Sequence, residues 1–176
     1  DPGLLMEAHY APICSQVHRG NFAESWKHFE LARQYEDLDR CKALAPHTGQ
    51  NSAITHRVCA AHARWPLGYP DQARQLTREA VRIAEGLNDP FSLAHGTNHA
   101  SWVIGFCGDA AEMEPLVQRT LKITVEQSFV FWAATGHVAQ SHLWNLQGRF
   151  KESIENCRLG MQAFRATGAE LHMCYG

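Results

Sequence analysis

The sequence predicts an all-α fold, an α-solenoid of about four helical hairpins that repeat about every 40 residues. Glycines mark this period, because Gly68, Gly108 and Gly148 are spaced by 40 residues, and Gly20 precedes Gly68 by 48. Between the glycines, apolar side chains recur every three or four residues, as they do on one face of a helix. Nowhere does the sequence keep the alternation of apolar and polar residues that is typical of a β-strand.

The composition is that of a folded domain or a short repeat array. The chain has 176 residues, of which 45% are hydrophobic, and 16 Lys and Arg against 18 Asp and Glu give a net charge of −2. Since this balance creates no broad cationic field, we expect no binding to nucleic acid or to an anionic membrane surface. No apolar run reaches the length of a membrane span. Six cysteines without a Cys-x-x-Cys pair favour reduced thiols in a cytoplasmic protein.

Each repeat is expected to contain two breaks and two helices. The glycine of each repeat closes a first helix, because glycine readily adopts the left-handed conformation, and a polar residue or proline after it opens the second helix. The other break is polar and precedes Phe91, Phe131 and Leu171, which are again 40 residues apart. The expected first helices are Leu4 to Val17, Asn51 to Trp65, Pro90 to Phe106 and Phe129 to Gln147. The expected second helices are Phe22 to Tyr35, Pro70 to Gly86, Glu112 to Gln127 and Phe150 to Thr167.

These helices define a single repeat domain over residues 1–176, with repeats at about 4–38, 51–87, 90–127 and 129–167. A fifth first helix is expected to begin at 169–176. Because a solenoid needs polar caps at its ends, we expect a fragment of a larger protein whose uncapped C-terminal end favours self-association. The first spacing exceeds the period, and we expect the surplus, residues 37–50, to be one long loop.

Small residues occupy fixed places in the second helices. Ala73 and Ala80 lie on a continuous apolar stripe, whereas Arg78 is expected on the outer face. Ala80, Thr120 and Gly160 share one column of the repeat. This column predicts that neighbouring helices approach closely there.

Three stretches carry a resemblance to a known family: His47-Thr48-Gly49-Gln50-Asn51, Trp65-Pro66-Leu67-Gly68-Tyr69-Pro70-Asp71-Gln72-Ala73 and Asp89-Pro90-Phe91-Ser92-Leu93-Ala94. The hairpins resemble degenerate tetratricopeptide repeats. Over about Ala45 to Leu171 they are similar to the C-terminal repeats of bacterial signalling proteins in which an adenylate or guanylate cyclase domain is joined to a predicted ATPase. The resemblance implies a right-handed α-solenoid that serves as a sensor or scaffold segment. It does not place cyclase or ATPase chemistry in this chain.

Catalytic motifs are missing from the sequence. It contains no phosphate-binding loop, no dinucleotide fingerprint, no nucleophile elbow and no His-Glu-x-x-His helix. We therefore expect no enzyme activity and no cofactor. The leading hypothesis is a protein-interaction or regulatory scaffold module of a cytoplasmic signalling protein.

Two alternatives stay open. Eleven histidines include several at helical spacing, so a metal-binding enzyme would use His56, Cys59, His62, His95 and His99. A small-ligand sensor would place its pocket near His47, Gln50 and Trp65.

First helices line the concave face of such a solenoid, where a protein or peptide partner, or another domain of the same chain, would bind in a groove. The residues expected to contact this partner are polar or aromatic members of the first helices: His62, Asn98, His99, Trp102, His142 and Asn145.

Overall fold

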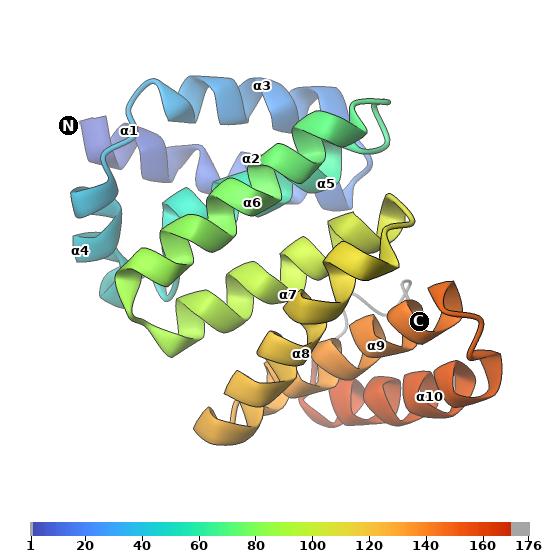
Figure 1. Cartoon of the computed structure of the whole chain (residues 1–176). Helices are drawn as coiled ribbons and strands as arrows, with labels where there is room; N and C mark the ends of the chain where they lie inside the picture. Colours follow the sequence, from blue (N-terminus) through green and yellow to red (C-terminus); the bar gives the residue numbers. More distant parts are fainter. Residues whose placement is uncertain (1, 170–176) are drawn as a thin grey trace. The chain divides into compact units, whose positions relative to one another are not determined.

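The structure, a computed structural model of the chain, describes residues 2–169, and every regular element in this range is an α-helix (Figure 1). The helices are α1 Pro2–Ala8, α2 Tyr10–His18, α3 Phe22–Arg33, α4 Leu38–Thr48, α5 Ser52–Arg64, α6 Pro70–Leu87, α7 Pro90–Phe106, α8 Ala110–Gln127, α9 Val130–Leu146 and α10 Phe150–Ala166. The predicted all-α class is thus confirmed for residues 2–169. The expected start of a fifth first helix lies, from residue 170 onward, outside the described residues. None of the helices described combines the length and apolar character that crossing a membrane demands.

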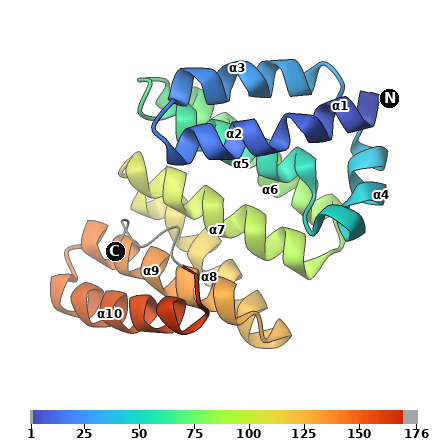
Figure 2. The ribbon, with the colours of Figure 1, turned by 180° about the vertical axis from the view of Figure 1, so that it is seen from behind.

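Contacts divide the chain into two compact units, residues 1–92 and 93–176. In the first unit, α2 and α3 pack against each other and both pack against α5, which also packs against α6 (Figure 2). In the second unit, α9 packs against both α8 and α10. Helices adjacent in sequence are therefore neighbours in space, which is compatible with a helical repeat. That one domain runs through 1–176 stays a prediction.

In the second, third and fourth repeats, the two breaks adopt a repeated backbone conformation. Gly68, Gly108 and Gly148 have φ of 86°, 74° and 77°, so each closes its first helix in the left-handed region, as predicted. The second helices end in the same way at three further positions spaced by 40 residues. These are Asn88, Ser128 and Gly168, with φ of 52°, 56° and 79°. The period therefore appears in backbone dihedral angles as well as in residue types.

The expected first helix from Leu4 to Val17 is wrong, because the chain forms two helices that meet at His9. Pro12 explains the break. Proline has no N–H for the carbonyl of Ala8, four residues earlier, and its ring clashes with that carbonyl in a continuous helix. With α2 beginning at Tyr10, Pro12 falls in the first turn, where a missing N–H costs nothing.

The expected long loop at 37–50 is also wrong, because most of it forms α4. The Asp37 side chain accepts a hydrogen bond from the backbone N–H of Arg40 (3.1 Å) and caps the helix start. Gly49 is left-handed, and its N–H donates to the carbonyl of Ala45 (2.9 Å). Pro46 lies within the last turn, so its ring removes only one hydrogen bond shortly before the helix ends. Local capping therefore outweighs the proline here.

Helix α8 starts at Ala110, earlier than the expected Glu112. The Asp109 side chain accepts from the N–H of Glu112 (3.0 Å) and caps the helix. Pro115 consequently lies inside the helix rather than in its first turn.

The predicted register of the second helices is confirmed in α6. Ala73 and Ala80 are completely buried, whereas Arg78 is exposed. In the second unit, a cluster from α7, α8 and α9 forms the core, with Ile104, Met113, Val117, Ala139 and Leu143 at its centre.

Candidate functional site

Helices α7 and α9 bring aromatic and imidazole rings together in the second unit. On α7, His95, His99, Trp102 and Phe106 are spaced by four, three and four residues, which places them along one face of the helix. Helix α9 adds rings near its two ends. We call the resulting set the α7–α9 aromatic surface, and its members are His95, His99, Trp102, Phe106, Trp132 and His142.

One half of this surface is centred on Trp132 and is largely interior, because Trp132 and His95 are both buried. Its ring stacks against His95 with centroids 5.2 Å apart and an interplanar angle of 25°. His99 meets the same indole edge-on at 5.9 Å, and the two imidazoles are 5.0 Å apart. The ring of Trp132 also meets that of Phe131 edge-on, with centroids 4.8 Å apart. Offset and edge-on contacts of this kind are the favoured geometries for aromatic pairs.

The other half is centred on His142. The centroid of its ring lies 6.2 Å from that of Trp102 and 6.0 Å from that of Phe106. The centroids of these two α7 rings are 6.2 Å apart. All three side chains are partly exposed. A large apolar ring beside an imidazole that can both donate and accept a hydrogen bond is therefore accessible here.

Two imidazoles of this surface, those of His95 and His142, are held in the neutral form. Burial lowers the pKa of His95 to about 4, and burial also lowers the pKa of His142 from its usual 6.5. The buried Nδ1 of His95 has no hydrogen-bond partner within the described residues. At neutral pH these two rings consequently contribute hydrogen-bonding atoms but no charge.

Five of the six residues predicted to bind a partner lie in the second unit, and His62 lies on α5 in the first. The structure brings His99, Trp102 and His142 into the α7–α9 aromatic surface. Asn145 is exposed on α9, one turn beyond His142. His95, Phe106 and Trp132 were not among the predicted contact residues, although the four-three-four spacing on α7 marks His95 and Phe106.

Asn98 does not lie on the exposed surface. Its side chain is only 2% exposed, and its amide nitrogen has no hydrogen-bond partner in the described part of the chain. Being one residue from His99, it is turned by about 100° around the helix axis. It therefore points away from the side of α7 that His99 and Trp102 share, and is corrected from a contact residue to an interior one.

The residues of the alternative metal site are not gathered into one. Among residues 2–169, no three His, Cys, Asp or Glu side chains are placed to share a metal ion. His56 is buried, and burial, followed by the charges of Arg57 and His9, lowers its pKa to about 4. The nearest sulfur to Cys59 is that of Cys14, at 3.0 Å.

A cavity of about 520 Å³ runs along α3, and a second, of about 400 Å³, lies near the end of α4. Gln50 lines the second cavity, as the small-ligand alternative expected, whereas His47 and Trp65 do not. Its polar lining also includes Lys42, Asp89 and Ser92. The Asp89 carboxylate is already engaged, since it accepts from the backbone N–H of Ser92 (2.9 Å).

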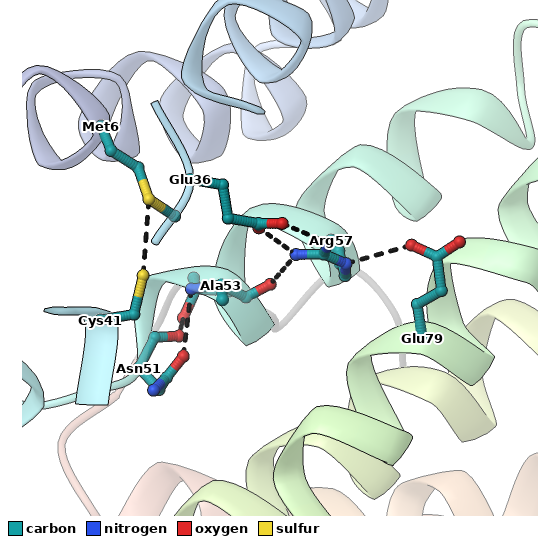
Figure 3. Close-up of polar contacts among 8 residues, drawn as sticks. Met6, Glu36, Cys41, Asn51, Ala53, Arg57 and Glu79 are labelled. Atoms are coloured by element: carbon teal, nitrogen blue, oxygen red, sulfur yellow. Dashed lines mark hydrogen bonds and ion pairs between the residues drawn. The ribbon is translucent and has the colours of Figure 1, made fainter. Parts of the chain in front are cut away.

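In the first unit, a buried cation joins three segments (Figure 3). Arg57 on α5 is 6% exposed and forms ion pairs with Glu36, which follows α3, and with Glu79 on α6. Its Nη2 donates to Glu36 at 2.8 Å, its Nε donates to Glu79 at 3.2 Å, and its Nη1 donates to the carbonyl of Ala53 at 3.0 Å. Burial lowers the pKa of Arg57, but the hydrogen bonds and charges of the two glutamates outweigh it and raise the pKa overall.

A second buried arginine, Arg64, joins α5 to α3 and to the start of α6 in the same unit. The guanidinium of Arg64 lies 3.6 Å from the ring centre of Tyr69 and 4.3 Å from that of Trp26. Its Nε donates to the side-chain oxygen of Gln72 at 2.8 Å. Neither arginine was predicted to be a buried structural group, although a charged residue within the alanine-rich α5 indicates one.

Comparison of the chain with protein-family models, with curated proteins and with solved structures finds no match. The relation to tetratricopeptide repeats therefore rests on the residues of this sequence alone.

Proposed function

We propose that the chain is a protein-interaction or regulatory scaffold module of a cytoplasmic signalling protein, a right-handed α-solenoid of about four tetratricopeptide-like hairpins. Its partner is a protein or peptide, and it binds at the partly exposed half of the α7–α9 aromatic surface, formed by Trp102, Phe106 and His142. The observation that supports this proposal is the grouping of partly exposed, uncharged rings from two expected first helices, with His142 between Trp102 and Phe106.

The chemistry of this surface defines the partner. Indole and phenyl rings supply large contact areas at low conformational cost and are enriched among the residues that dominate binding energy. His142, which burial keeps neutral, offers one donor and one acceptor. We infer a peptide segment with an apolar or aromatic anchor residue that sits against Trp102, next to a backbone or amide group that hydrogen-bonds His142.

The role does not require chemistry from the module itself. The sequence carries no motif for nucleophilic, phosphoryl-transfer or hydride-transfer reactions. A binding surface on stacked helices acts by presenting its partner, and packing between neighbouring repeats limits the motion of whatever is attached.

The test is selection of a peptide library against the whole chain, followed by calorimetry on the enriched peptide. Trp102→Ala and Asn145→Arg are expected to weaken binding at least tenfold, the first by removing the anchor contact and the second by placing a long cation beside His142. Asn145 is exposed, so its substitution leaves the core intact.

The matched control is Phe150→Ala, an exposed aromatic residue of α10 in the same unit, which should bind the peptide like the unmodified chain. Peptides that bind Trp102→Ala and Asn145→Arg as tightly as the unmodified chain would refute this site. A failure to enrich any peptide would count against the interaction function as a whole.

A further inference from the structure

Two cysteines far apart in the sequence meet in the first unit. Cys14 on α2 and Cys59 on α5 are separated by 45 residues, yet their Sγ atoms lie 3.0 Å apart. Both thiols are free, and both side chains are partly exposed. Packing of α2 against α5 produces this contact.

The Cys14 and Cys59 thiols lie beside a tyrosine and a glutamine that are hydrogen-bonded to each other. Tyr10 lies one turn before Cys14 on α2, and its hydroxyl accepts a hydrogen bond from the Gln50 side chain. Burial, and then the charges of Cys14 and Cys59, raises the pKa of Tyr10 to about 12. The hydrogen bond with Cys14, burial and the charge of Cys14 raise the pKa of Cys59. Cys59 therefore carries its proton at neutral pH.

The other described cysteines provide a comparison. Cys41 is buried, and its thiol contacts the Sδ of Met6 at 3.5 Å, which leaves it a packed core group (Figure 3). Cys107, in the turn between α7 and α8, and Cys157, on α10, are partly exposed free thiols of the second unit. The Sγ atoms of Cys14 and Cys59, 3.0 Å apart, need to move only a short way to reach the disulfide bond length of about 2.05 Å.

We propose that Cys14 and Cys59 form a reversible disulfide modification site that a hydroperoxide oxidises. The sulfur of Cys14 attacks one peroxide oxygen, the O–O bond breaks, and the products are a sulfenic acid on Cys14 and water, or an alcohol from an organic hydroperoxide. The sulfur of Cys59 then attacks the sulfur of Cys14, the S–O bond breaks, and hydroxide leaves with the Cys59 proton as water. Two thiols lose two electrons in total, and one peroxide gains them.

The disulfide would tie α2 to α5 and close a loop of 45 residues. A crosslink over such a distance stabilises the native state, largely by restricting the unfolded chain. Oxidation would hold the first hairpin against the second, and reduction would release it. This inference does not depend on the proposed partner site, which lies on α7 and α9.

The experiment treats the reduced whole chain with hydrogen peroxide, blocks the remaining thiols with N-ethylmaleimide, and maps peptides by mass spectrometry without reduction. We expect one intramolecular crosslink between the peptides of Cys14 and Cys59, a rise in melting temperature of several degrees, and reversal of both by dithiothreitol. Cys14→Ser and Cys59→Ser should lose the crosslink and the rise. Cys107→Ser and Cys157→Ser, the matched controls, should keep both.

Mapping of the unmodified chain decides the question even where a variant folds poorly. Recovery of Cys14 and Cys59 as separately blocked or over-oxidised peptides would overturn the proposal. A crosslink to any other cysteine in preference, or an oxidised form that melts like the reduced one, would overturn it as well.

Discussion

At the scale of single residues, the first unit is organised around a cation inside its core. Arg57 would be costly to bury alone, because its charge loses its hydration. Glu36 and Glu79 compensate for that loss from two different segments, and the carbonyl of Ala53 accepts a further hydrogen bond (Figure 3). The arginine thereby specifies how α5 meets the segment after α3 and the helix α6.

Arg57→Ala is expected to destabilise the chain by about 3–5 kcal/mol, because it leaves two largely buried carboxylates without their cation. The free energy of unfolding in urea measures this. Lys122→Ala is the control, since the Lys122–Glu126 pair on α8 is long, at 3.9 Å, and exposed. Equal, small losses from both substitutions would show that the buried ion pairs do not hold the unit together.

At the scale of elements, two features recur with the period of the repeat: the conformation in which second helices end, and the small residues where neighbouring helices pack closely. Second helices end at left-handed residues spaced by 40, Asn88, Ser128 and Gly168. The column of small residues in the same helices marks close approach. A Cβ on Gly160 would lie 2.9 Å from Val138 Cγ2 and 3.2 Å from the carbonyl oxygen of Ala134 on α9. In α8, the Thr120 hydroxyl shares a hydrogen bond with that of Thr97 at 2.8 Å.

Two glycine-to-alanine substitutions should therefore have opposite effects. Gly160→Ala is expected to destabilise the chain by about 1–3 kcal/mol, because the methyl group overlaps the backbone and side chain of α9. Gly86→Ala should stabilise it by about 0.5–1 kcal/mol, since this helical glycine has open space around it and alanine lowers the entropy cost of helix formation. Chemical denaturation measures the free energy of unfolding of both variants. If Gly160→Ala stabilised the chain as Gly86→Ala does, the close packing of α10 against α9 would be contradicted.

At the scale of the whole molecule, each unit buries a histidine in its neutral form. His56 in the first unit and His95 in the second are almost fully buried, and the pKa of each is lowered to about 4. The second unit also exposes apolar side chains on α10, Phe150 and Ile154 among them. The stability of both units is thus expected to depend on pH.

Acidification should destabilise the fold before carboxylates titrate. An unfolded histidine takes up a proton near pH 6.5, whereas folded His56 and His95 do so only near pH 4. The stability that each contributes is complete above pH 6.5 and is lost as the pH falls toward 4, by about 2 kcal/mol per histidine at pH 5. Urea unfolding at pH 7 and pH 5 measures this loss.

His56→Gln and His95→Gln should each make stability less dependent on pH over this interval, because glutamine does not titrate. Stability that falls as steeply in both variants as in the unmodified chain would show that other groups cause the acid sensitivity.

Much of the fold could be predicted because its signals are local. Helix ends at glycines, apolar stripes and small-residue columns each depend on residues within a few turns, so the ranges of α6, α7, α9 and α10 agree with the prediction to within a residue. The errors at His9 and in α4 were also local. The break at His9 depends on Pro12, which cannot bond to the carbonyl four residues before it. The start of α4 depends on capping by the Asp37 side chain.

The sequence by itself determined the helical class, the 40-residue period and which faces of the helices are apolar, since backbone and side-chain preferences act over a few residues. Only the tertiary structure decided that Arg57 is paired by Glu36 and Glu79, that Cys14 meets Cys59, that His142 lies beside Trp102, and that Asn98 is buried. These contacts join residues on different helices or depend on the packing around one side chain. They follow from how side chains from several helices fill a common space, which no spacing along one helix encodes.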